Sequence, residues 1–230
     1  MKVRIGTQNM TEGLVTQDLR LCDAVMLQEI PNQAALRNGF GNAWNWYFPP
    51  GDVHQAIGWR HKVLNRLGEG QSWRYHRSGK ADPQIPDKVH TPSRWLHRQR
   101  LMLEVVGVPV SLYGTWAINS WNPFHPDQWT DTRRWLFDDK TWPVIEREMV
   151  QRDEDEDLDI LGGDLNSVKA RLKLRDYNSF PRVGMDRQFY PDDPRIRLVR
   201  SGKGARTGKG KDLQHHLLWG DYEITRGGKR

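Results

Sequence analysis

The sequence contains very little cysteine and no long apolar run. Cys22 is the only cysteine in 230 residues, so a disulfide within the chain is excluded and we expect a reducing compartment. No apolar stretch reaches the roughly 20 residues with which a helix crosses a bilayer. Residues 1–5 also lack the apolar segment of a signal peptide. We therefore expect a cytoplasmic protein that does not enter a membrane.

Internal repeats and linker-like segments are also absent, and this absence predicts one domain over residues 1–230. We expect this domain to be a monomer. Basic residues outnumber acidic ones, 35 to 29, which gives a net charge of +6. A basic surplus favours an anionic partner, and we expect nucleic acid, DNA rather than RNA. A merely soluble basic protein would have the same composition. The 11 tryptophans indicate either core packing or a stacking groove.

Short apolar runs bounded by turn residues predict strands that outnumber the helices. We expect strands at residues 2–8, 23–29, 55–60, 98–106, 109–115, 158–161, 196–200 and 217–224. Helices are expected at residues 14–21, 131–152 and 167–175. The strands at 98–106 and 109–115 flank Gly107 and predict a hairpin. Interleaved strands and helices indicate an α/β fold with mixed sheets.

Two charge runs interrupt this pattern. Residues 153–159 hold six acids, and such a run usually repels itself in solvent, so we expect a loop rather than a metal site. Residues 200–211 hold Arg200, Lys203, Arg206, Lys209 and Lys211 among glycines. This basic run predicts either a flexible solvated loop or a mobile loop that grips phosphates.

Polar side chains stand where several apolar strands end. Asn9 and Glu29 end the first two strands, Asp164 and Asn166 follow the strand at 158–161, and His215 and His216 precede the last one. Strand ends that converge form ligand sites in α/β sheets. Carboxylate and amide oxygens are hard ligands that suit Mg²⁺ or Mn²⁺. A lone Asp or Asn at such a position would equally serve as a turn or helix cap.

Four segments taken together resemble the motifs of the endonuclease/exonuclease/phosphatase (DNase I-like) superfamily. They are Thr7-Gln8-Asn9, residues 23–29 (DAVMLQE), residues 163–166 (GDLN), and His215-His216-Leu217-Leu218 followed by Asp221-Tyr222. Residues 91–95 (TPSRW) are similar to a stretch of phage-encoded members. The resemblance implies a four-layer α/β/β/α sandwich with two mixed β-sheets.

The resemblance also implies a metal-dependent phosphodiesterase, an endonuclease that hydrolyses nucleic-acid phosphodiester bonds. Glu29, helped by Asn9, would hold Mg²⁺ or Mn²⁺ against the scissile phosphate. Asp164 would orient or deprotonate the attacking water. Asn166 would hydrogen-bond a phosphate oxygen, and His215 would contact the phosphate and take part in proton transfer.

The sequence departs from the family pattern at two positions. Gln214 stands where the closing motif has an Asp before its His, and Trp116 stands where a His follows a central strand. Gln has no titratable proton at neutral pH, and Trp offers one donor only. A further family Asp aligns near Arg195, shortly after Asp192 and Asp193. His125 or His216 could substitute, and the alignment could also slip by one residue.

Three function classes stay open at this point. The first is an active nuclease, whose phosphate contacts would include Arg133, Lys203, Arg206, Lys209 and Lys211. Arg133 could equally lie on a solvated helix face packed by tryptophans. The second is a weakened or inactive relative that binds nucleic acid without cutting it. The third is a phosphoesterase for another phosphorylated substrate, because one fold hosts many activities.

Overall fold

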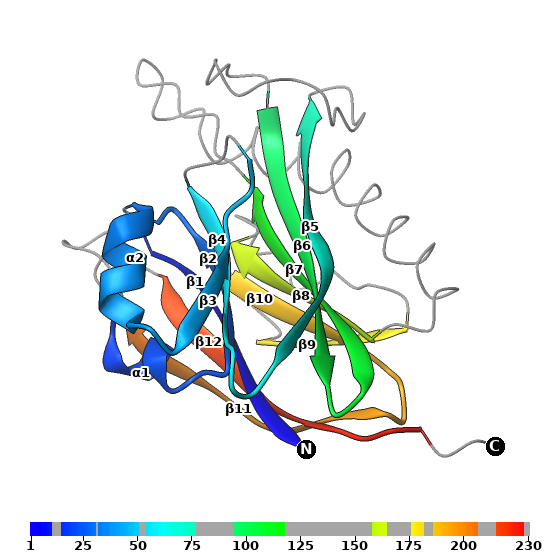
Figure 1. The fold of residues 1–230 in the computed structure, drawn as a ribbon. Helices are drawn as coiled ribbons and strands as arrows, with labels where there is room; N and C mark the ends of the chain where they lie inside the picture. Colours follow the sequence, from blue (N-terminus) through cyan, green and yellow to red (C-terminus); the bar gives the residue numbers. More distant parts are fainter. Residues whose placement is uncertain are drawn as a thin grey trace.

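The computed structural model describes residues 1–10, 15–30, 32–50, 54–76, 94–117, 158–164, 176–181, 186–206 and 215–227. For residues 73–76, 94–98, 116, 117 and 206 it describes the backbone alone. Two six-stranded sheets lie face to face (Figure 1). We refer to them as sheet A and sheet B.

Sheet A has the strand order β11-β12-β1-β2-β4-β3. Its strands are β1 (Lys2–Asn9), β2 (Ala24–Gln28), β3 (Trp44–Tyr47), β4 (Gln55–Arg60), β11 (Ile196–Arg206) and β12 (His216–Ile224). The strands β1 and β2 run parallel, whereas the other neighbours are antiparallel. Sheet A is therefore mixed, as the interleaved sequence pattern predicts.

Sheet B has the order β5-β6-β7-β8-β10-β9. Its strands are β5 (Asn65–His76), β6 (Arg94–Val105), β7 (Val108–Ala117), β8 (Leu158–Asp164), β9 (Tyr177–Phe180) and β10 (Asp186–Pro191). Its one parallel pair is β7 with β8. The predicted hairpin is confirmed, and Val106 (φ 56°) and Gly107 (φ 74°) form its turn. Positive φ at both central residues matches the twist of a two-residue hairpin.

The main core fills the space between the two sheets. Alternate residues of each strand point inward, so Val3 and Ile5 of β1 meet Leu112 of β7 and Ile160 of β8 in one buried cluster. Burial of such apolar surface contributes about 25 cal/mol per Å² and is the main force that holds the sheets together. Because the inward positions of β1 continue to Thr7 and Asn9, the same alternation carries polar side chains to the end of the core.

A second core lies on the outer face of sheet A, beneath helices α1 (Gln17–Arg20) and α2 (Gln33–Phe40) (Figure 1). The side chains of Thr16 and Asn32 cap these helices by accepting hydrogen bonds from the N–H groups of Leu19 and Ala35. Trp44 and Trp46 are buried here against Phe40. For these two tryptophans, core packing is confirmed and a stacking groove is excluded.

The structure corrects two predictions made from the charge runs. Asp159 does not lie in a solvent loop. It is a buried residue of β8, between the apolar residues Leu158 and Ile160. Arg200 and Lys203 belong to β11, which pairs with β12, so this half of the basic run is a strand rather than a loop. Pairing with a neighbour overrides the weak strand propensity of a glycine-rich segment. Residues 153–157 and 207–211 lie outside the described residues.

Candidate active site

Three of the predicted strand-end residues meet at one end of the sandwich. Asn9 is the last residue of β1, Asp164 is the last residue of β8, and Glu29 directly follows β2. The amide nitrogen of Asn9 donates two hydrogen bonds of 2.9 Å, one to Oε1 of Glu29 and one to Oδ2 of Asp164. Asn9 therefore joins a carboxylate next to sheet A to a carboxylate of sheet B.

His215 joins the cluster from the segment that leads into β12. It directly precedes β12, and its Nε2 lies 3.9 Å from Oδ2 of Asp164. Its other ring nitrogen, Nδ1, lies 2.9 Å from Oδ2 of Asp186, the first residue of β10. Three acid and imidazole groups thus lie in a row, with His215 between Asp164 and Asp186.

Asp186 is a residue of the cluster that the sequence motifs do not indicate. The expected further acid was placed near Arg195, but Asp193 instead forms an ion pair with Arg195 through contacts of 2.8 Å and longer. The position is hard to recognise because Met185-Asp186-Arg187-Gln188 reads as a charged surface segment. No alternation of apolar and polar residues marks this strand, because residues 186–189 are all buried.

The environment of His215 and Asp186 shifts the pKa of each group. Burial opposes protonation of His215, but the hydrogen bond to Asp186 and the negative charges of Asp164, Asp186 and Glu29 outweigh it and raise the pKa of His215 to about 9. Burial also raises the pKa of Asp186, although the hydrogen bond to His215 works in the opposite direction. The pair therefore holds at least one proton across neutral pH, and His215 is the cation.

The backbone beside the carboxylates is specialised. Gly163 precedes Asp164 with φ 159°, and a Cβ atom there would lie 1.7 Å from the carbonyl oxygen of Thr115. Only glycine fits this position, which accounts for the Gly-Asp order of the motif. Glu29 adopts φ 48°, a conformation that costs an L-residue about 1–2 kcal/mol. Such strain is found preferentially at functional sites.

The donor set fits a hard divalent cation held by Glu29 and Asn9. A carboxylate and an amide oxygen are the ligand types that Mg²⁺ and Mn²⁺ prefer. Ligand atoms of Asp164, Asp186 and His215 also lie within 4.8 Å of one another. That second set would bind a metal only with release of the ring proton of His215, because an imidazole coordinates through a deprotonated nitrogen. We therefore assign metal binding to Glu29 and Asn9 as a prediction.

The described part of the basic run lies beside this cluster. Lys203 is exposed on β11, and its positive charge is among the influences that lower the pKa of Asp186. The adjoining backbone is anchored. The side-chain amide of Gln8 donates a hydrogen bond to the carbonyl of Ala205 (3.2 Å), and the backbone N–H of Ala205 donates one to Oδ2 of Asp18 (2.8 Å). His216 contributes a contact of 3.2 Å between Nδ1 and the carbonyl of Gly204, which joins the start of β12 to β11. Its role as a substitute acid–base residue stays a prediction.

The structure does not describe the side chains of the remaining predicted residues. Asn166, Arg133, Lys209, Lys211, His125 and Gln214 lie outside the described residues, and the side chain of Arg206 is not described. Trp116 is placed by its backbone alone, directly opposite Asp164 in the β7–β8 register. Their roles stay predictions. The structure gives His215 a carboxylate partner, Asp186, which the closing motif with Gln214 does not indicate.

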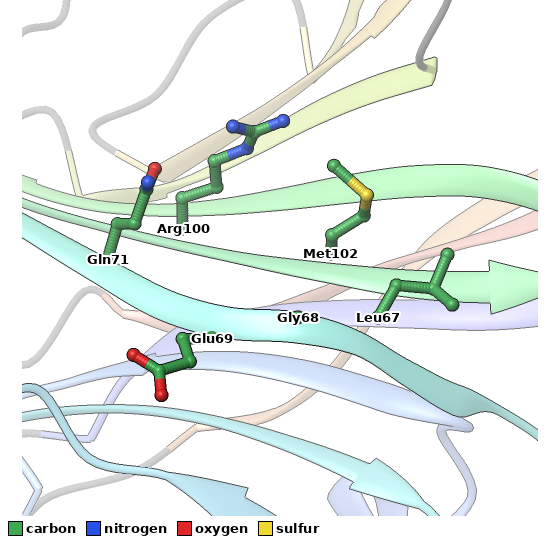
Figure 2. Close-up of a pocket in the computed structure, with 6 residues that line it drawn as sticks. All are labelled: Leu67, Gly68, Glu69, Gln71, Arg100 and Met102. Atoms are coloured by element: carbon green, nitrogen blue, oxygen red, sulfur yellow. The ribbon is translucent and has the colours of Figure 1, made fainter.

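A pocket of about 250 Å³ lies elsewhere on sheet B (Figure 2). It is lined by Leu67, Gly68, Glu69 and Gln71 of β5 and by Arg100 and Met102 of β6. The guanidinium of Arg100 donates to the hydroxyl of Ser111 at 2.9 and 3.1 Å. Since β7 separates these strands from β8 in the sheet order, the pocket is not part of the candidate site.

Comparison with known proteins identifies the fold. No family model matches the sequence, and no curated protein matches it. Among solved structures, the endonuclease/exonuclease/phosphatase from Bacteroides vulgatus superposes with a TM-score of 0.66 at 12% identity, covering 98% of this chain and 100% of the other. D. rerio TDP2 complexed with a single-strand DNA product gives 0.59 at 14%, covering 96% and 98%.

A mannosyl-6-phosphatase from Bacteroides thetaiotaomicron gives a TM-score of 0.61 at 12% identity, covering 97% of this chain and all of the other. The chain therefore has the DNase I-like fold, with two mixed sheets packed face to face, as the sequence motifs predict. The similarity to phage-encoded members stays a prediction. Among the described residues, no helix is both long and apolar enough to cross a membrane.

Proposed function

We propose that the protein is a metal-dependent phosphodiesterase that hydrolyses phosphodiester bonds of nucleic acid, with DNA preferred to RNA. One observation carries the proposal. Side chains at the ends of five strands in two sheets form one cluster: hydrogen bonds join Asn9 to Glu29 and Asp164, another contact joins Asp186 to His215, and His215 lies 3.9 Å from Asp164. Burial of a carboxylate costs free energy, and clusters of such groups are typical of functional sites. The convergence of buried Asp164 and Asp186 with half-buried Glu29 therefore supports a catalytic site.

Each residue has a chemical role in this proposal. Glu29 and Asn9 would hold a divalent cation, which would stabilise the negative charge that develops on the phosphate oxygens. Asp164 accepts the proton of the attacking water. Asp186 holds Nδ1 of His215 and so directs Nε2 toward the reacting phosphate, where the imidazolium donates a hydrogen bond to an oxygen. The hydrogen bonds from Asn9 keep the two carboxylates apart and oriented.

Charge supports nucleic acid as the substrate. The chain carries a net charge of +6, and Lys203 is exposed beside the catalytic group. A strand of linked phosphates gains more from several cations than a single phosphate does. The neighbour solved with a single-strand DNA product has the same fold, which is consistent with this substrate class. The single domain, the monomeric state and the cytoplasmic location stay predictions from the sequence.

A phosphomonoesterase is the second candidate, because a mannosyl-6-phosphatase shares the fold. The same group of residues would serve either reaction, since in both water attacks phosphorus and one bond from phosphorus to an ester oxygen breaks. Charged residues around the site would decide which of the two substrates binds. Lys203 favours the polyanion over the sugar phosphate.

The test is incubation of the purified protein with plasmid DNA, with a single-stranded oligonucleotide and with mannose 6-phosphate. Each substrate is assayed with Mg²⁺, with Mn²⁺ and with EDTA, alongside the Glu29→Gln variant. We expect DNA cleavage that needs the metal and is lost in the variant. Release of phosphate from the sugar alone would favour the second candidate. Binding of DNA without cleavage under every condition would leave a non-catalytic nucleic-acid binder.

A further inference from the structure

Gln188 forms a buried polar contact between the two sheets. It lies on β10, is fully buried, and comes two residues after Asp186 on the same face. Its amide nitrogen donates to the carbonyl of Ile5 on β1 (3.2 Å) and to that of Leu218 on β12 (3.0 Å). Its amide oxygen accepts from the hydroxyl of Tyr222 at 3.0 Å.

These three hydrogen bonds use both N–H donors of the amide and its oxygen. In a buried setting, directional bonds of this kind are strong, and breaking one leaves a costly unpaired group. The fold also provides space for them. A Cβ atom on Gly162, the register partner of Gln188, would lie 3.3 Å from Cγ of Gln188 and 2.5 Å from Cε of Met26. The glycine lets the two sheets approach closely where Gln188 crosses between them.

The position of this contact matters for the pair formed by Asp186 and His215. Asp186 belongs to sheet B, whereas His215 leads into β12 of sheet A, and no backbone ladder joins β10 to β12. The distance between the two groups therefore depends on how the sheets pack. The hydrophobic effect between the sheets is non-directional, whereas a hydrogen bond has a preferred distance and angle. Gln188 instead bonds to β12 at Leu218, three residues after His215.

The carboxylate of Asp186 has fewer hydrogen bonds than the amide of Gln188. Its Oδ2 contacts His215, and its buried Oδ1 has no hydrogen-bond partner. The carboxylate is thus placed by the backbone of β10 rather than by further side-chain contacts. The backbone of β10 is in turn tied to sheet A by Gln188, two residues away.

From these contacts we propose that Gln188 is a positioning residue that fixes the carboxylate of Asp186 against the imidazole of His215. This inference rests on the proposed function, in which that pair is catalytic. Gln188 contacts neither substrate nor metal and acts through Asp186. Tyr222 supports it by binding the amide oxygen, which keeps the two N–H groups turned toward the carbonyls of sheet A.

The experiment compares three variants. Gln188→Met keeps the length of the side chain and removes all three hydrogen bonds. Tyr222→Phe removes only the bond to the amide oxygen, and it serves as the second probe if Gln188→Met does not fold. Gln99→Met is the matched control. Gln99 is also a fully buried glutamine on an inner face of sheet B, but neither polar atom of its side chain has a hydrogen-bond partner.

Two readouts are measured for each variant. The first is the NMR titration of the His215 ring in metal-free protein, assigned with His215→Gln. The second is the pH profile of kcat for DNA cleavage. In Gln188→Met we expect the pKa of His215 to fall from about 9 toward about 6.5. We also expect kcat to fall by roughly 10- to 100-fold, as small misplacements of catalytic groups do. Tyr222→Phe should change both in the same direction by less, and Gln99→Met should change neither.

An unchanged His215 titration in Gln188→Met and Tyr222→Phe would overturn the inference, even if stability or kcat fell. So would an equal shift in Gln99→Met, because the effect would then follow from any core substitution. If the parent protein shows no cleavage, the proposed function fails. The titration of His215 then still decides whether Gln188 positions the pair.

Discussion

The imidazole of His215 lies 2.9 Å from the carboxylate of Asp186, although the two residues come from different sheets. The sequence places Gln214 where a carboxylate is expected and so indicates a histidine without an acidic partner. Asp186 supplies that partner from β10. A carboxylate bound to one ring nitrogen fixes the tautomer and orientation of the imidazole. The acid–base half of the site is therefore more complete than the motif alone implies.

Replacing Asp186 should impair catalysis strongly. Asp186→Asn keeps the size of the side chain but removes the charge that favours the imidazolium. We expect kcat for DNA cleavage to fall by about 10²- to 10⁴-fold, the usual contribution of general acid–base groups. Steady-state kinetics at neutral pH would measure this. Gln214→Asp provides the comparison and should not raise the rate, since Nδ1 of His215 is already bound. A faster Gln214→Asp variant would mean that Asp186 is not the functional partner.

Stability should depend on pH through the same pair. The pKa of His215 is raised from its ordinary value of 6.5 to about 9. The stabilisation from the charged imidazole is therefore fully present below pH 6.5 and is lost as the pH rises through 9. We expect on the order of 1–3 kcal/mol to disappear from the free energy of unfolding over this range. Urea denaturation of the parent and of His215→Gln between pH 6 and pH 10 would measure the difference, and parallel curves for the two proteins would contradict it.

The backbone at Glu29 gives a prediction about strain. Glu29 has φ 48°, which a residue with a Cβ atom adopts at a cost of about 1–2 kcal/mol. Glu29→Ala and Glu29→Gly both remove the carboxylate, but only Gly removes the strain. We expect Glu29→Gly to unfold at a higher temperature than Glu29→Ala, and both to lack cleavage activity. In unstrained secondary structure the order is the reverse, by roughly 0.5–1 kcal/mol. An Ala variant as stable as the Gly variant would argue against strain at this residue.

The basic run should govern the salt dependence of DNA binding. Replacing Lys203, Arg206, Lys209 and Lys211 with Gln should flatten the slope of log affinity against log salt by about 3 to 4, at roughly 0.9 per phosphate contacted. Binding titrations at several salt concentrations would give the slope. Arg197→Gln is the control, because Arg197 is exposed on the same strand and forms an ion pair with Glu223. An unchanged slope in the fourfold variant would remove the basic run from the binding surface.

Much of the fold follows from local sequence. The strands at residues 2–8 and 55–60 have apolar side chains at regular positions and correspond to β1 and β4. The contiguous motifs around Asn9, Glu29 and Asp164 could be recognised because each combines a buried strand with a polar end. These features depend on neighbours in sequence, so a single sequence contains them.

The rest depends on contacts between distant segments. His215 and Asp186 are 29 residues apart, and nothing in either local segment indicates that they meet. Gln188 is polar, and the free-energy cost of burying its amide is offset by hydrogen bonds to carbonyls of two strands in the other sheet. Strands β3, β5, β9 and β10 were not predicted, and β11 was predicted to end at residue 200. In β11, the strand continues because β12 lies beside a glycine-rich segment that would otherwise favour a loop.

The most direct test of the central claim is the rate at which the protein cleaves a labelled single-stranded oligonucleotide at saturating Mn²⁺. The parent, Asp164→Asn and Gln99→Met are compared, with thermal unfolding measured on the same samples. We predict cleavage by the parent and by Gln99→Met, no cleavage with EDTA, and a loss of at least about 10²-fold in Asp164→Asn. Cleavage that persists in EDTA, or an Asp164→Asn variant as fast as the parent, would contradict the account of this site as a metal-dependent phosphodiesterase.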